Sequence, residues 1–345
     1  MRGTLRLCLI LIFVCLWFPG NARCRQRNGE DGFFMVSGHL YDLSREVGVK
    51  QEFVTRAIPF INSTNPDFLI LTGDVVFAVT NQGPRPPETI REQYRYLMPA
   101  VFDKIATRIY CVAGNHDTGK KPYPPAVELF EKNLNPLSFT FEHKGSLFLF
   151  LSLYRPFPHM ETGSAFSRIT RVWADYDTAA SRALLDELRS TLQGKYDHVF
   201  IFVHFSPLTE FRIGYYWTNY LVPLLSSLDQ DVHIFSTSQL AKPPFAFPEN
   251  QVVTFKNLRF YCFAEFPVGS YLVNYDAEKV RVQLVRGSNF VPSPLKETPY
   301  RPTTRFSMLK SHLYFWCVLV PKGKLKQYWL EYAGIISRLL KKCFP

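Results

Sequence analysis

The sequence is poor in cysteine, with 7 in 345 residues. Outside the apolar N-terminal stretch, the remaining five are Cys24, Cys111, Cys262, Cys317 and Cys343. A sparse and odd set of this kind excludes a small fold held together by disulfides. Cys111 and Cys262 fall in apolar runs and are expected in buried strands, while a bridge from Cys24 to Cys343 or Cys317 stays open.

Long hydrophobic runs are also absent. The run LCLILIFVCLWF has twelve residues, short of the roughly 20 that a bilayer-spanning helix needs. Arg2 and Arg6 precede it, and the small residues Gly20-Asn21-Ala22 follow it. This order is typical of a secretory signal peptide, so residues 1–22 are expected to be removed. The secretory pathway, with a secreted or periplasmic product, is favoured over a retained membrane anchor.

Acidic residues are outnumbered by basic ones, 29 against 40, which gives a formal net charge of +11. The charge is +9 without residues 1–22, because this segment contains two arginines and no acid. A chain this basic is attracted to anionic partners, such as phosphorylated substrates or lipid head groups. No nucleic-acid recognition motif accompanies the charge, so specific nucleic-acid recognition is not expected.

Much of the excess positive charge lies in residues 291–345. Prolines predict a linker at the start of this segment: Pro292, Pro294, Pro299 and Pro302. Beyond it, apolar residues recur at helical spacing: Leu325, Trp329, Tyr332, Ile336 and Leu339. Lys341 and Lys342 follow, so the pattern predicts a basic amphipathic tail. Docking of this helix on the domain is favoured over peripheral contact with a membrane surface, which stays the alternative.

Three apolar runs end in polar side chains. They are FLIL before Gly73-Asp74, IYCV before Gly114-Asn115-His116-Asp117, and VFIFV before His204. Runs without polar alternation predict strands that are covered on both faces, as in parallel sheets. Ligands bind at the carboxyl ends of such strands, so these side chains are expected to converge in one cleft.

In order and spacing, these motifs resemble the calcineurin-like metallophosphoesterases. That family shows D-x-H, G-D, G-N-H-[DE], a lone H and G-H-x-H, and it includes purple acid phosphatases, protein phosphatases and many phosphodiesterases. Here the second motif is Gly73-Asp74, the third spans residues 114–117, and the fourth is His204. The resemblance covers roughly residues 33–286, and G-N-H-D is its specific part.

The resemblance implies a role for each of these residues. Asp74 would bridge two divalent metals, and Asn115 and His204 would hold the second of them. His116, held by Asp117, would protonate the leaving oxygen or stabilise charge on the phosphate.

The first and last motifs depart from the family pattern. Ser37-Gly38-His39 stands where the family has D-x-H, with His39 placed one position away. A turn after the first strand is favoured for His39 over a role as metal ligand. Residues 236–239, Ser-Thr-Ser-Gln, replace G-H-x-H, and none is a good ligand for zinc, iron or manganese. The prediction is one divalent ion rather than two, with Mn, Fe, Zn and Mg not distinguished.

The rest of the chain predicts alternating strands and helices, followed by antiparallel strands. Strands are expected at 33–37, 68–72, 108–113, twice within 138–152, at 198–204, at 232–235 and in the run up to residue 286; helices are expected at 50–62, 88–104, 124–134, 178–193 and 219–228. This order predicts an α/β domain at 33–290, in which two mixed sheets pack face to face with helices outside. The resemblance implies the same four-layer αββα sandwich. His233, inside a short strand, is expected to be a packed core histidine.

Two functional hypotheses follow. The first is an exported metal-dependent phosphoesterase, acting on phosphomonoesters or phosphodiesters with a reduced metal site. The second is a catalytically inactive relative that binds a phosphate-bearing or acidic partner. The intact G-N-H-D motif favours the enzyme slightly, whereas the altered first and last motifs favour the binding protein.

Overall fold

The structure is a computed structural model that describes residues 31–42, 48–80, 82–119, 123–152, 179–205, 221–237, 251–263, 270–286 and 290–299. The predicted signal peptide at 1–22 and the tail from residue 300 onward lie outside these residues. Within the described part of the chain, no helix has both the length and the apolar character needed to cross a membrane.

The first of the two large sheets is mixed. Its strand order is β14 (Val291–Ser293), β13 (Val280–Arg286), β12 (Ser270–Tyr275), β1 (Gly32–Ser37), β2 (Phe68–Leu71) and β5 (Arg108–Cys111). The last three strands are parallel, whereas β12, β13 and β14 pair in antiparallel fashion. The carboxyl ends of β1, β2 and β5 therefore share one edge.

The second sheet is also mixed. Its strand order is β15 (Lys296–Pro299), β10 (Gln251–Phe255), β11 (Leu258–Phe263), β9 (Asp231–Thr237), β8 (His198–Phe205), β7 (Ser146–Phe150) and β6 (Phe139–His143). Strands β11, β9, β8 and β7 are parallel. Alternate residues of β8 face opposite sides, so Phe200 and Phe202 point toward the first sheet while Val199 and Ile201 point away.

An aromatic core fills the space between the sheets. Phe34 of β1 is fully buried and contacts the ring of Phe148 at 5.4 Å and that of Phe200 at 5.2 Å, both edge to face. Each sheet thus buries one face against the other, and helices cover its outer face, so strands that are buried on both faces read as continuous apolar runs.

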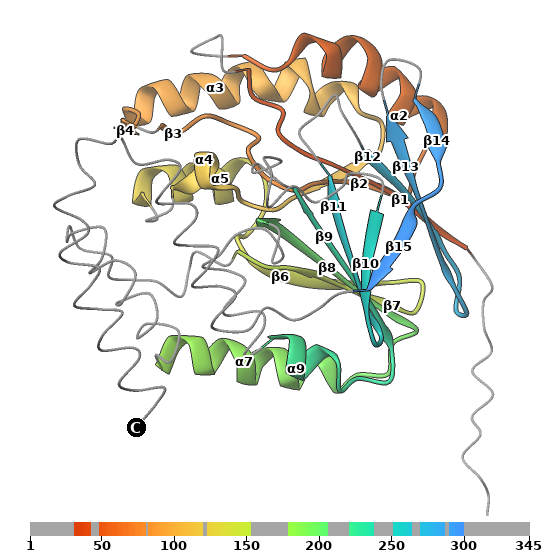
Figure 1. Cartoon of the computed structure of the whole chain (residues 1–345). Helices are drawn as coiled ribbons and strands as arrows, with labels where there is room; N and C mark the ends of the chain where they lie inside the picture. The colour runs from red at the N-terminus through yellow and green to blue at the C-terminus, as the bar shows by residue number, and fades with distance from the viewer. Residues whose placement is uncertain are drawn as a thin grey trace, which may run out of the picture. The chain divides into compact units, whose positions relative to one another are not determined.

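Helices cover the two outer faces (Figure 1). The π-helical turn η1 (Phe53–Ala57) and the helices α2 (Ile58–Thr64), α3 (Pro87–Ala100) and α5 (Pro124–Asn133) pack on the first sheet, and a short 3-10 turn η2 (Phe102–Lys104) follows α3. On the second sheet lie α7 (Ala179–Leu192) and α9 (Val222–Leu225). The predicted four-layer αββα fold is confirmed.

Three segments differ from the sequence-based predictions. Residues 291–299, predicted as a linker, form β14 and β15, which extend the two sheets beyond residue 290. Both are edge strands, where Pro292 and Pro299 are tolerated because an edge position needs no donor on its outer side. A short hairpin of β3 (Val79–Thr80) and β4 (Gly83–Pro84) was not predicted, and the described part of helix 219–228 is the short α9.

Candidate metal centre

Four strand ends deliver the candidate residues to one place. His39 follows β1, Asp74 follows β2, and Asn115 begins the short helix α4 (Asn115–Thr118) after β5. His204 comes from the second sheet, one residue before the end of β8. The sequence-predicted convergence of Asp74, Asn115 and His204 is thus present, and it draws on both sheets.

Two glycines permit the close approach of these loops. Gly73 has φ 99°, and a Cβ placed there would lie 2.5 Å from Nδ1 of His204. At Gly114 a Cβ would overlap the carboxylate of Asp74. Asp74 itself has φ 56°, a left-handed conformation that aspartate adopts more readily than most residues. The glycines of the G-D and G-N-H-D motifs therefore serve to bring the strand ends into contact.

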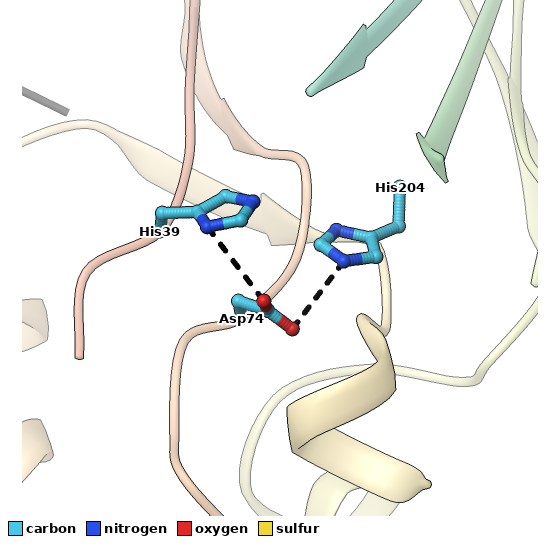
Figure 2. Close-up of side chains that lie close together, drawn as sticks. All are labelled: His39, Asp74 and His204. Carbon is cyan, nitrogen blue, oxygen red and sulfur yellow. Dashed lines mark ion pairs between the residues drawn. The ribbon is translucent and has the colours of Figure 1, made fainter. Parts of the chain in front are cut away.

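The polar atoms of the centre lie within a few ångströms of one another. His204 Nε2 lies 3.4 Å from Asp74 Oδ1 and 3.1 Å from Asn115 Oδ1. Figure 2 shows His39 on the other side of the carboxylate, with its Nδ1 3.6 Å from Asp74 Oδ2. One ligand atom each from His39, Asp74 and His204 fall within 4.8 Å of one another, so these three residues could hold one ion.

The hydrogen bonds of His204 determine where its proton resides. Its Nδ1 lies 2.7 Å from the carbonyl oxygen of Thr72, which can only accept. The neutral ring therefore carries its proton on Nδ1 and leaves a lone pair on Nε2. That lone pair faces the carboxylate oxygen of Asp74 and the amide oxygen of Asn115. Three electron-pair donors gathered around one point fit a divalent cation.

The surroundings of Asp74 and His204 favour an ionised carboxylate and a neutral imidazole. Burial alone would raise the pKa of Asp74, but the neighbouring His204, His39 and His116 together hold this pKa below its usual range. Burial lowers the pKa of His204 to about 4, against the opposing effect of Asp74. At neutral pH the pair is thus a carboxylate and a neutral imidazole, the forms that bind metals.

His116 differs from its neighbours because it is half-buried, whereas Asp74, Asn115 and His204 are buried. Its backbone N–H donates to Asp74 Oδ1 at 3.0 Å, which fixes it beside the cluster. Its ring Nδ1 lies 2.6 Å from the carbonyl oxygen of Val79, in β3. Because Nδ1 donates to this carbonyl, any proton exchange with a ligand takes place at Nε2.

Asp117 does not hold His116, which corrects the role predicted for it. Its carboxylate accepts four backbone N–H groups, from Asp74 and Gly114 on Oδ2 and from Val75 and Val76 on Oδ1, at 2.7–2.8 Å. These bonds occupy both oxygens and tie the loop after β2 to the loop after β5. Burial and the charge of Asp74 raise the pKa of Asp117 to about 7, while the N–H groups act in the opposite direction.

The first motif is less altered than the sequence analysis supposed. His39 stands two residues after Ser37, which is the spacing of D-x-H, so the aspartate alone is replaced. His39 is buried at 1% exposure and stacks on the His204 ring at 5.2 Å. It also has φ 57°, so it both turns the chain and enters the cluster. The two interpretations considered for His39 are therefore compatible.

A threonine takes the place of the last motif at the end of β9. The Thr237 hydroxyl donates to the carbonyl of His204 at 2.9 Å and lies 3.3 Å from its Nδ1. It supports His204 and supplies no imidazole, so the centre is poorer in nitrogen ligands than the family pattern. Ser238 and Gln239 lie outside the described residues.

Tyr41 is a site residue that the sequence analysis missed. Its hydroxyl donates to Asp74 Oδ2 at 3.4 Å, and its ring meets that of His116 edge to face at 5.4 Å. The sequence offered one signal, a tyrosine two residues after His39 in the loop beyond a predicted strand.

A family model and several solved structures are similar to this chain. A family model described as calcineurin-like phosphoesterase matches residues 36–236, and a search of the curated proteins found no matching sequence. Among solved structures, GAP50, the anchor in the inner membrane complex of Plasmodium, is 13% identical with a TM-score of 0.50, over 82% of this chain and 94% of that one. A dimetal phosphatase from Danio rerio is 11% identical with a TM-score of 0.43, over 73% and 98% of the two chains. Since the family model covers more than half of the sequence and the fold agrees, the chain belongs to the calcineurin-like phosphoesterase family.

Proposed function

We propose that this protein is a metal-dependent phosphoesterase, which hydrolyses a phosphate mono- or diester with one divalent ion held by Asp74, Asn115 and His204. The observation that carries the proposal is the arrangement of His204 Nε2 within 3.4 Å of Asp74 Oδ1 and 3.1 Å of Asn115 Oδ1. Without a cation these three electron-pair donors repel one another, so the arrangement makes sense as a binding site.

The donor set suits a divalent ion of the Mn, Fe, Zn or Mg group. It offers a carboxylate, an amide oxygen and a neutral imidazole, with His39 as a further donor beside Asp74 Oδ2. Three protein ligands that leave a position open are typical of catalytic metal sites. Such an ion supplies charge for a phosphoryl oxygen and lowers the pKa of bound water. Ser37 and Thr237 in place of stronger ligands favour one ion over two.

His116 is the residue proposed to exchange a proton with the ester. Its Nδ1 is held by the Val79 carbonyl, its backbone is held by Asp74, and its side chain is half-buried. Once Nε2 is also protonated, a ring fixed in this way can deliver that proton to the leaving oxygen of the ester and keep its N–H on Nδ1. Asp117 contributes indirectly, because it fixes the two loops that carry Asp74 and His116.

A second candidate function is phosphate-dependent binding without turnover. The replacements at Ser37 and Thr237 remove two of the family's strongest ligands, and the chain carries a net charge of +11 that attracts anions. The similar GAP50 is described as the anchor in the inner membrane complex of Plasmodium, so the fold by itself does not decide between the two candidates.

We also propose that the protein is exported. The N-terminal pattern supports removal of residues 1–22, and the basic tail beyond residue 300 supports contact with an anionic surface or partner. N-terminal sequencing of the protein from its native host is expected to begin near Arg23. A chain that still begins at Met1 would contradict export by this route.

The proposed function is tested by removing the charge of Asp74. Asp74→Asn is expected to abolish both divalent-metal binding at the centre of Asp74, Asn115 and His204 and hydrolysis of an aryl phosphate panel that contains a monoester and an activated diester. The matched control is Asp103→Asn, an exposed aspartate in η2, which is expected to change neither. If wild type shows no metal-dependent hydrolysis above the Asp74→Asn background across the panel, the binding function replaces the enzyme.

A further inference from the structure

A second cluster of possible ligands lies at the opposite ends of the strands that carry His204. His198 is the first residue of β8 and pairs with Asp231, the first residue of β9. His233 follows Asp231 by two residues, so both side chains fall on the same face of β9. One ligand atom each from His198, Asp231 and His233 lie within 4.8 Å of one another.

The cluster is separate from the centre at Asp74. His198 and His204 are six residues apart on one strand, which corresponds to about 20 Å at the usual rise of a β-strand. Phe200 and Phe202 occupy the positions between them on the same face and belong to the core between the sheets. The two clusters therefore lie at opposite ends of the strands of the second sheet and cannot share an ion.

The hydrogen bond of His198 fixes which ring nitrogen is free to bind a metal. Its Nε2 lies 2.8 Å from the carbonyl oxygen of Asp276, in the turn between β12 and β13. A carbonyl only accepts, so Nε2 carries the proton and Nδ1 keeps the lone pair. That Nδ1 is buried and has no hydrogen-bond partner among the described residues.

His233 also has a hydrogen-bond partner at one of its two ring nitrogens. Its Nδ1 lies 3.0 Å from the hydroxyl of Tyr261, whose ring stacks on it at 5.8 Å. A hydroxyl accepts as well as donates, so Tyr261 can accept the Nδ1 proton and leave the lone pair on Nε2. Its Nε2 is buried without a hydrogen-bond partner in the described part of the chain. Both histidines are 2% exposed, and burial also lowers the pKa of His233, so the ring stays neutral. An unsatisfied lone pair at this depth is unfavourable unless a ligand satisfies it.

We propose that His198, Asp231 and His233 form a second divalent-metal site, suited to zinc. Two neutral imidazoles and one carboxylate are a known zinc ligand set. Metal-binding histidines normally donate their other N–H to a carbonyl or a similar acceptor, and Asp276 and Tyr261 stand in these positions. Asp231 is 40% exposed, which gives the ion a path from solvent.

The positive charge of Arg259 weakens the attraction of the site for a cation but leaves one carboxylate oxygen of Asp231 without a bond to the arginine. Its Nη1 lies 2.6 Å from Asp231 Oδ1, so it neutralises part of the carboxylate charge. The second oxygen, Oδ2, stays available to a metal. Arg259 therefore limits the affinity of this site for a metal ion. The two histidines determine where the ion would bind.

The test measures zinc binding to the full-length protein in the Asp74→Asn background, in which the first centre has lost its charge. Equilibrium dialysis followed by metal analysis is expected to give one zinc per chain, with an increase in the melting temperature that a chelator reverses. His198→Phe or His233→Phe is expected to weaken this binding by about 100-fold, and Asp231→Asn weakens it without a change in the core.

A matched pair of tyrosines separates a metal site from simple packing. Tyr261→Phe removes the hydroxyl that orients His233 and is expected to weaken zinc binding about 10-fold. Tyr275→Phe removes the hydroxyl bonded to His143, 2.6 Å away at the same end of the strands, and is expected to leave zinc binding unchanged. Absence of zinc binding in the Asp74→Asn protein, or binding that persists in His233→Phe and Asp231→Asn, would overturn the proposal whatever the outcome at the first centre.

Discussion

At the scale of single residues, the proposed metal centre depends on which ring nitrogens carry protons. His204 gives its N–H to Thr72, so its other nitrogen joins Asp74 and Asn115 as an electron-pair donor. The sequence predicted that these three side chains would converge, and they do, because each lies at the carboxyl end of an apolar strand. It could not reveal the tautomer, which depends on a carbonyl from a different strand.

The role of His116 is tested by its removal. His116→Ala is expected to preserve the fold and metal affinity, because this ring is not among the proposed ligands. Hydrolysis of an aryl phosphate is expected to fall by about two orders of magnitude, the usual contribution of a positioned acid. The measurement compares kcat and metal affinity in the same preparation, and loss of the metal together with activity would make His116 a ligand or a structural residue.

At the scale of elements, Asp117 and the two glycines explain why the loops after β2 and β5 lie in contact. Asp117 accepts four backbone N–H groups from these loops, a role that depends on the tertiary path of both. The motif suggested the simpler contact with its neighbour His116, which is wrong. Strands with continuous apolar runs were predictable, whereas β14 and β15 were not, because short proline-containing segments resemble linkers.

Gly114→Ala tests the contact between these two loops. Gly114 has φ −91°, which any residue adopts, so its replacement creates steric overlap with Asp74 without backbone strain. We expect a loss of stability of about 1–3 kcal/mol and at least 10-fold weaker metal binding. Denaturant unfolding and metal titration measure the two effects.

The control for this substitution is Gly83→Ala in β4. Gly83 has φ 134°, and a Cβ there would meet nothing within 4 Å, so backbone strain acts without overlap, in a strand that carries none of the proposed metal ligands. Its replacement is expected to lower stability but not metal affinity. Equal effects of the two substitutions on metal affinity would argue against a specific role for the Gly114 contact.

At the scale of the whole molecule, the order of strands and helices in the sequence predicted two sheets that pack face to face, and the structure shows that aromatic side chains fill the space between them. Residues of chemical interest that lie on a strand interior were harder to recognise. Asp231 and His233 share one face of β9 through their spacing of two, but His198 joins them only through pairing of β8 with β9. A sequence shows the first relation directly, whereas the second requires knowledge of which strands are neighbours.

Buried histidines make the stability of the fold depend on pH. The pKa of His233 lies well below its ordinary value and that of His204 is about 4, in both cases chiefly because of burial. The unfolded chain binds protons at these rings below about pH 6.5, while the folded chain does not, so stability falls as pH falls.

Each such histidine contributes a slope of up to about 1.4 kcal/mol per pH unit. Urea unfolding with a chelator present, at pH values from 7 to 5, is expected to show a smaller slope in His233→Phe than in wild type by about this amount. Equal slopes would mean that the His233 ring takes up its proton in the folded protein.

The most direct measurement of the central proposal is the location of bound metal in crystals grown with Mn²⁺, by anomalous X-ray scattering. Manganese suits the oxygen-rich ligands at the ends of β2 and β5. We predict one ion in contact with Asp74 Oδ1, Asn115 Oδ1 and His204 Nε2. An absence of metal there would contradict the proposed centre, and two ions about 3.5–4 Å apart on either side of Asp74 would contradict the reduced site.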